Sequence, residues 1–154
     1  LTPMENLVFF GKMYGLDHPQ DSALAVLEDV GLAFRRNDRV RTFSRGMLQR
    51  LSIARAILHN PSILFLDEPF TGLDIHASNI LKEHLQTLHN NKRTILMTTH
   101  DISCGLEMCD KVAVQVMGKF AFLKDIKDVD KENFEALYFD MVRNNQFTMA
   151  IRSH

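Results

Sequence analysis

Residues 63–69 read ILFLDEP, and this stretch indicates how the surrounding chain folds. A continuous run of apolar residues such as ILFL is typical of a strand that is buried on both faces of a sheet. The run ends at Asp67, Glu68 and Pro69. At such a strand end the first acid can hold Mg²⁺, often through water, and the second can polarise an attacking water molecule. A strand that merely ends in acidic turn residues gives the same pattern. The neighbouring motifs decide between such a strand end and a site for Mg²⁺ and water.

Helices and strands are predicted to alternate around this stretch. Apolar residues at helical spacing predict helices over about 3–14, 21–31, 45–58, 75–89, 102–108 and 131–144, the first with a capping box made by Thr2 and Glu5. A second buried strand is predicted over 93–99, and a hairpin over 111–123 around Gly118. This order predicts an α/β fold with a mainly parallel sheet, whose ligand lies at the carboxyl ends of the strands. Asp67 and His100 both fall at such ends.

The composition limits the class of protein. The chain has 154 residues, of which 45% are apolar and 24% are charged, as in an ordinary globular domain. A net charge of -1 excludes a generally basic nucleic-acid binder. The longest run without a charged residue, 56–66, is too short to cross a bilayer. Cys104 and Cys109 fit neither a disulfide framework nor a metal half-site, which favours a reducing compartment and packing roles.

A second motif lies upstream, where residues 44–50 read SRGMLQR and open a predicted helix. The hydroxyl of Ser44, the glycine at 46 and the free amides of a helix start form a good anion site. Downstream, residues 71–74 read TGLD and residues 98–100 read TTH. In this order the four motifs resemble the signature, Walker B, D-loop and switch histidine of ABC-type ATPases. Residues 1–123 are therefore similar to the ATP-binding subunit of an ABC transporter.

Further stretches refine this resemblance. The opening LTPMENL, residues 1–7, looks like the segment that follows the family's glutamine loop. Residues 43–50 are most similar to ATPase subunits of the small-exporter type, in particular to the haem-exporter ATPase of cytochrome c biogenesis. The run DRVRT at 38–42 strengthens that comparison.

The resemblance implies an α/β fold, the C-terminal part of a P-loop (RecA-like) ABC ATPase domain with a helical subdomain. Residues 1–50 would form the helical signature subdomain, 51–125 the second half of the ATPase core, and 126–154 a C-terminal helix and tail. A phosphate loop needs Gly-x-x-x-x-Gly-Lys followed by Ser or Thr. The Gly-Lys pairs at 11–12 and 118–119 lack both the earlier glycine and the hydroxyl residue. The chain by itself is therefore expected to be inactive.

The resemblance also implies roles for single residues. Asp67 would hold Mg²⁺ through its water shell, and Glu68 would act as the general base or orient the water. His100 would contact the γ-phosphate of ATP and sense its loss. Asp74, in the D-loop motif, would communicate across a dimer interface.

The signature turn would bind the ATP that a second subunit holds. Ser44 and Gly46 would cap its γ-phosphate, and the helix start favours negative charge. Arg45 and Met47 stand where the commonest form of the motif has glycine and glutamine. The side chain of Arg45 could add charge near the phosphate or simply face solvent. Gln49 completes the predicted nucleotide-binding set.

The implied protein is an ATP-hydrolysing subunit of an exporter-type transporter, with ATP and Mg²⁺ as cofactors. Its partners would be a second ATPase subunit, which shares two ATP molecules, and a transmembrane permease subunit, but no nucleic acid. It would lie in the cytoplasm on the inner face of the cell membrane. Two alternatives stay open: a naturally short, ATPase-dead partner that supplies the signature in trans, and a soluble ABC ATPase of translation or DNA repair.

Several other side chains have less specific interpretations. The arginines of 35–41 are expected in a solvated loop, with no aromatic platform for RNA among them. Three histidines are expected on a solvated helix surface rather than around a metal: His76, His84 and His89. Three aromatic residues are expected in the core, with one or two alternatively lining a groove for the permease: Phe9, Phe10 and Tyr14.

Overall fold

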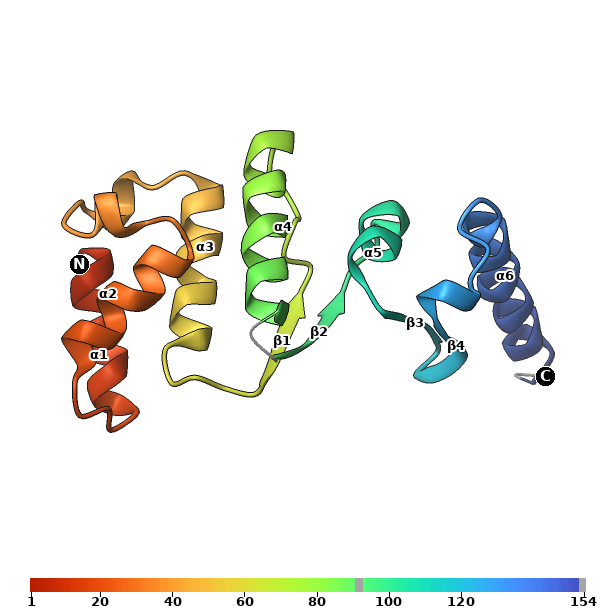
Figure 1. The fold of residues 1–154 in the computed structure, drawn as a ribbon. Coiled ribbons are helices and arrows are strands. Elements are labelled where there is room, and N and C mark those ends of the chain that lie inside the picture. Colours follow the sequence, from red (N-terminus) through yellow and green to blue (C-terminus); the bar gives the residue numbers. More distant parts are fainter. Residues whose placement is uncertain (91–92, 153–154) are drawn as a thin grey trace. The chain divides into compact units, whose positions relative to one another are not determined.

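The computed structural model describes residues 1–90 and 93–152, with side chains placed as far as residue 143. The chain divides into two compact units, Leu1–Thr99 and His100–His154. Figure 1 colours them along the sequence, from red at the N-terminus to blue at the C-terminus. Each unit is described by itself.

The first unit begins with helices α1 (Pro3–Met13) and α2 (Pro19–Asp29), which pack against each other. The predicted capping box of α1 is confirmed, because the amide of Glu5 donates to Oγ1 of Thr2 and the amide of Thr2 donates to the Glu5 carboxylate. Helix α2 begins at Pro19, earlier than the predicted start at 21, because proline suits the first helical position.

Helix α3 (Arg45–Ile57) completes a helical bundle with α1 and α2. It begins directly after Ser44, as the capping pattern predicts. Apolar side chains from all three helices form the core of this bundle: Leu7, Ala23, Leu27, Ile53 and Ile57.

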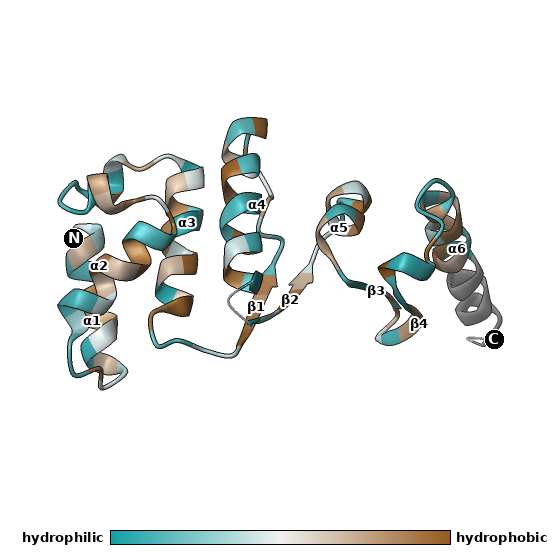
Figure 2. Cartoon of the chain, in the orientation of Figure 1, coloured by the Kyte–Doolittle hydropathy of each residue, from teal (hydrophilic) through white to brown (hydrophobic). Residues whose placement is uncertain are grey.

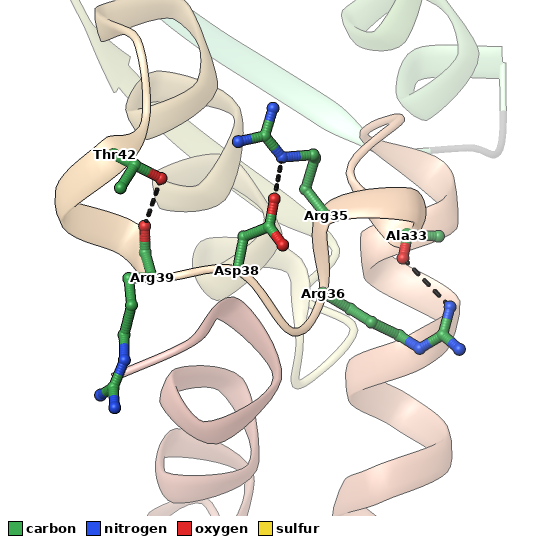
Figure 3. A network of polar contacts seen from close by, with 6 residues as sticks. All are labelled: Ala33, Arg35, Arg36, Asp38, Arg39 and Thr42. Carbon is green, nitrogen blue, oxygen red and sulfur yellow. Dashed lines mark hydrogen bonds and ion pairs between the residues drawn. The ribbon is translucent and has the colours of Figure 1, made fainter.

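Two short 3₁₀ turns, η1 (Ala33–Arg35) and η2 (Val40–Thr42), lie in the segment that was expected to be a loop. Figure 3 shows the polar contacts that hold these turns, which join Arg35 to Asp38, Arg36 to the carbonyl of Ala33, and Thr42 to the carbonyl of Arg39. All of these side chains are exposed or half-buried, as expected of a solvated segment. The side chains of Arg35 and Arg36 therefore stabilise the turn to which they belong.

Strands β1 (Ile63–Asp67) and β2 (Thr94–Thr98) form a parallel pair in which Asp67 lies opposite Thr98. The parallel pairing confirms the predicted topology, but the prediction that both strands are buried on both faces is wrong. Exposed and buried residues alternate along β1, with Phe65 71% exposed and Leu66 9% exposed. The remainder of the described chain covers one face of this two-stranded sheet and leaves Phe65 and Leu96 open to solvent.

Helix α4 (Ile75–Asn90) connects the two strands. Its apolar and polar residues alternate in bands, which Figure 2 shows as brown and teal. Leu81, Leu85 and Leu88 are buried, as their spacing predicts. Each completely buried leucine contributes about 1.5–3 kcal/mol relative to exposure, so this stripe is a major source of stability in the first unit.

The aromatic residues of α1 differ from prediction. Phe9 is 56% exposed and Tyr14 is 47% exposed, whereas a core position was expected. Phe10 is half-buried beneath Arg55, whose Cζ lies 4.8 Å from the ring centroid. The helix turns Leu7 and Gly11 inward, so Phe9, two positions from each, falls on its outer side, and Tyr14 follows the last residue of the helix.

The second unit contains α5 (Ile102–Met108), the hairpin of β3 (Lys111–Val116) and β4 (Lys119–Asp125), the 3₁₀ turn η3 (Ile126–Asp128) and α6 (Phe134–Arg152). The hairpin is antiparallel and turns at Gly118, as predicted. Three buried residues form a core cluster in this unit, namely Leu106, Val114 and Phe134.

Helix α6 begins three residues after the predicted start at 131. The delay has a local cause, since the carboxylate of Asp130 accepts hydrogen bonds from the amides of Glu132 and Asn133 and holds them in a turn. Among the described side chains of α6 only Phe134 is buried, and Tyr138 and Met141 pack half-buried against the same core at helical spacing. Leu137 and Phe139 are exposed, so the predicted amphipathic pattern of 131–144 holds only for this stripe. Within 1–90 and 93–152, none of the helices combines the length and the apolar character that a membrane span requires.

Candidate functional site

The predicted acidic pair lies at the end of β1. Asp67 is its last residue, and Oδ1 of its carboxylate accepts a hydrogen bond from the hydroxyl of Thr98 on β2. The next amide, of Glu68, donates to the carbonyl of Thr98 over 3.0 Å. Thr98 therefore holds both acidic residues at the carboxyl edge of the sheet.

The backbone of Glu68 has a left-handed conformation, with φ of 48°. In that region an L-residue costs about 1–2 kcal/mol. The turn that follows stabilises the residue from two sides, because the amide of Thr71 donates to its carbonyl and the hydroxyl of Thr71 donates to Oε2 of its carboxylate, both over 3.2 Å. Strain of this kind at a half-buried carboxylate is typical of functional positions.

The side chain of Asp67 is exposed, so its carboxylate is open to a cation or a water molecule. Mg²⁺ usually takes one or two protein carboxylates together with water and phosphate oxygens. Among the residues that the structure describes, no three or more His, Cys, Asp or Glu side chains are grouped so that they could hold a metal ion alone. Asp67 thus fits a Mg²⁺ whose other ligands are water and phosphate.

The signature turn lies at the start of α3. Ser44 is the capping residue, and its Oγ accepts the amide of Met47 over 3.3 Å. Its hydroxyl hydrogen stays available to an acceptor outside the helix. The side chains of Met47 and Gln49 are half-buried, whereas those of Ser44 and Arg45 are exposed.

Gly46 is buried, and the reason is close packing. A Cβ atom on Gly46 would lie 2.9 Å from Cβ of Ala77, in the first turn of α4. Arg45 next to it reaches Gly72, where a Cβ atom would lie 2.7 Å from its Nε. The signature turn therefore packs directly on the segment that follows the acidic pair.

Asp74 caps α4. Its Oδ1 accepts the amide of Ala77 over 2.7 Å, and its carbonyl accepts the amide of Ser78 over 2.9 Å. Asp74 thus has a local structural role beside the predicted one across a dimer interface, which stays a prediction. His100 begins the second unit, two residues after the end of β2, and its relation to the acidic pair also stays a prediction.

One polar cluster in the first unit differs from expectation. His84 was expected on a solvated surface, but it is half-buried beside Gly31 and Arg50. Arg50 donates to the carbonyls of Val30 and Gly31 at the end of α2. Burial lowers the pKa of His84, and the nearby Arg50 charge lowers it further. Burial also lowers the pKa of Arg50.

Two site residues had no role in the sequence interpretation, namely Thr71 and Thr98. Both lie within motifs that the sequence reveals, TGLD and TTH. Strand pairing supplies the signal for Thr98, because a parallel register that aligns the ends of both strands places it opposite Asp67. The Thr71 contact depends on the left-handed backbone of Glu68, which no local pattern predicts.

Comparison with known proteins agrees with these features. Residues 1–71 match the family model described as ABC transporter. The chain is 40% identical over 126 residues to the ABC transporter ATP-binding protein NatA of Bacillus subtilis (strain 168), which covers 79% of this chain and 50% of that protein. It is 39% identical over 123 residues to a fluoroquinolones export ATP-binding protein of Mycobacterium tuberculosis (strain CDC 1551 / Oshkosh), covering 80% of this chain and 40% of that protein.

A solved structure shows the fold. The chain superposes on MJ1267, an ATP-binding cassette of an ABC transporter, with a TM-score of 0.78 and 19% identity, over 92% of this chain and 62% of that one. The fold is therefore that of an α/β ATP-binding cassette, of which this chain forms a part. Together these findings support the family of ABC transporter ATP-binding domains. The chain spans half or less of the length of the two relatives named above.

Proposed function

We propose that this chain belongs to an ATP-hydrolysing subunit that drives export through a membrane permease. The observation that carries the proposal is the acidic pair at the end of β1, held by Thr98 and Thr71, beside a helix start that suits phosphate. Relatives described as ATP-binding proteins of transport systems support the same activity.

In this proposal Asp67 binds the water shell of Mg²⁺, and the bound ion supplies positive charge to the phosphates. Glu68 accepts a proton from the attacking water, or orients that water, at its carboxylate. The contact from Thr71 fixes this carboxylate in place. His100 donates to the γ-phosphate.

The signature turn acts on the ATP of a second ATPase subunit. The hydroxyl of Ser44 and the amide of Gly46 donate to phosphate oxygens, and the positive end of α3 favours the anion. Arg45, Met47, Gln49 and Asp74 belong to the same face of the proposed dimer. Two chains and two ATP molecules then form one closed assembly.

The permease is proposed to contact the outer side of α1. Phe9, Met13 and Tyr14 are exposed there, and Tyr14 also packs on His59, with ring centroids 4.6 Å apart. Apolar side chains gathered on a surface favour a protein partner. The proposed subunit accordingly lies on the cytoplasmic, inner face of the membrane.

Haem export for cytochrome c maturation is the finer proposal for the cargo, and it rests on the resemblance of residues 38–50. The fluoroquinolones export relative supports export of small molecules in general. The alternative of an ATPase-dead partner that supplies the signature in trans is less favoured. The carboxylate of Glu68 is held by a specific contact, which such a partner would not need.

The test is to measure ATP turnover of the Glu68→Gln variant of the natural protein that contains these residues, assembled with its permease. Loss of a general base lowers turnover by on the order of 10²–10⁴-fold. We expect that loss of ATP turnover, with ATP binding retained, and unchanged turnover in Glu28→Gln, which alters an exposed residue of α2. Normal turnover in Glu68→Gln would contradict the proposal. A chain that raises or lowers the turnover of an intact subunit, without turnover of its own, would favour the alternative.

A further inference from the structure

The contact between Arg45 and Gly72 joins two motifs that lie 27 positions apart in the sequence. A Cβ atom on Gly72 would lie 2.7 Å from Nε of Arg45, and closer still to Cζ and Nη1. The guanidinium therefore occupies the space that a side chain at residue 72 would need. Gly72 also has φ of 73°, a conformation that suits glycine.

A second close contact lies beside the first. Gly46 packs on Ala77, with 2.9 Å left for a Cβ atom. The first turn of α3 thus meets both the loop at residue 72 and the first turn of α4. The Gly46–Ala77 contact fixes the signature turn against α4, and the side chain of Arg45 covers Gly72 from the same turn.

The loop leads from Gly72 to the acidic pair. Its turn is closed by the amide of Leu73, which donates to the carbonyl of Phe70 over 3.1 Å. Thr71, the neighbour of Gly72, donates its hydroxyl to the carboxylate of Glu68 and its amide to the carbonyl of Glu68. A displacement of Gly72 therefore moves the group that orients Glu68.

We propose that Arg45 is a positioning residue that holds the loop 70–73 through Gly72 and, through Thr71, the carboxylate of Glu68. The inference rests on the proposed function, in which Glu68 acts on the attacking water. It gives the signature turn a second task besides phosphate binding. Engagement of Ser44 and Gly46 by an anion then affects the carboxylate of the same chain through Arg45, Gly72 and Thr71.

The experiment compares Arg45→Ala, Gly72→Ala and the double variant by ATP turnover in the natural protein with its permease. A misplaced catalytic group costs roughly 10–100-fold in rate. We expect each single variant to lower kcat by that factor with KM for MgATP within twofold. The double variant should lose no more than the worse single variant, because both changes break the same contact.

Two controls separate this contact from backbone strain and from charge. Gly15 has φ of 72° with nothing within 4 Å of a built Cβ, so Gly15→Ala carries the same backbone change without a clash, and we expect wild-type kcat. Arg45→Lys keeps the positive charge but loses the planar group that covers Gly72. Arg45→Lys should therefore recover less than half of the kcat that Arg45→Ala loses.

Two results would overturn the inference. One is a loss of kcat in the double variant that equals the product of the fold losses in Arg45→Ala and Gly72→Ala. The other is a wild-type kcat in Arg45→Lys. Wild-type turnover in Glu68→Gln would instead refute the proposed function. If Gly72→Ala does not fold, or if ATP turnover does not depend on Glu68, amide hydrogen exchange in Arg45→Ala tests whether Arg45 holds the loop. Exchange about tenfold faster at Thr71 and Leu73 supports the contact, and unchanged exchange contradicts it.

Discussion

Replacing Glu68 by glycine is expected to leave the protein more stable than replacing it by alanine. Both changes remove the carboxylate and its contact with Thr71, so they differ in one methyl group and in the backbone freedom that its absence allows. Alanine keeps the left-handed conformation at φ of 48°, which costs an L-residue about 1–2 kcal/mol. Glycine removes that cost and loses about 0.5–1 kcal/mol in extra chain entropy. The difference should therefore lie between about 0 and 1.5 kcal/mol in favour of glycine, with a middle value of about 0.75 kcal/mol.

The assay is urea unfolding followed by circular dichroism, with the unfolding free energy compared between the two variants. Gln86, exposed in the middle of α4, provides the matched control. There the backbone is helical, so glycine should be less stable than alanine by about 0.8–1.0 kcal/mol, the opposite sign. Both Glu68 variants should lack ATP turnover. An alanine variant at 68 that is more stable than the glycine variant would refute the assignment of strain to this residue.

Two further predictions concern packing and pH. Gly46→Ala should destabilise the protein by about 1–3 kcal/mol through overpacking on Ala77, and a gain of about 1 kcal/mol from helix propensity offsets part of this loss. Adding Ala77→Gly should relieve the overpacking. If the changes in unfolding free energy of the two single variants simply add in the double variant, the contact is contradicted. The unfolding free energy should fall as pH drops below 6.5, the ordinary pKa of histidine, because His84 has a lowered pKa when folded and the unfolded chain then binds more protons. His84→Gln should reduce this slope in a pH titration of urea midpoints, and an unchanged slope would show that other groups cause it.

The elements that the sequence predicts well depend on local chemistry. Thr2 and Glu5 form their capping box, and Ser44 begins α3, because each side chain bonds an amide only three positions away. The leucine stripe of α4 follows in the same way from helical spacing. The sequence alone therefore places the motifs at 44–50 and 63–69 on a helix start and a strand end.

The features that were missed depend on contacts between distant segments. The apolar run of β1 predicts coverage of both faces, but coverage is set by which other elements pack there. His84 is half-buried because Arg50 and the end of α2 lie against it, and these come from separate helices. The guanidinium of Arg45 meets Gly72 for the same reason. No spacing rule for one helix or one strand includes such contacts.

The open face of the β1–β2 pair has a practical consequence for measurements in solution. The register places Phe65 beside Leu96, so the two exposed side chains form one apolar strip on the folded protein. Fluorescent dyes that respond to apolar surfaces would bind this strip before any unfolding takes place. A dye-based melting curve of this chain would start from a high signal and understate the transition, whereas circular dichroism would report the loss of its helices directly.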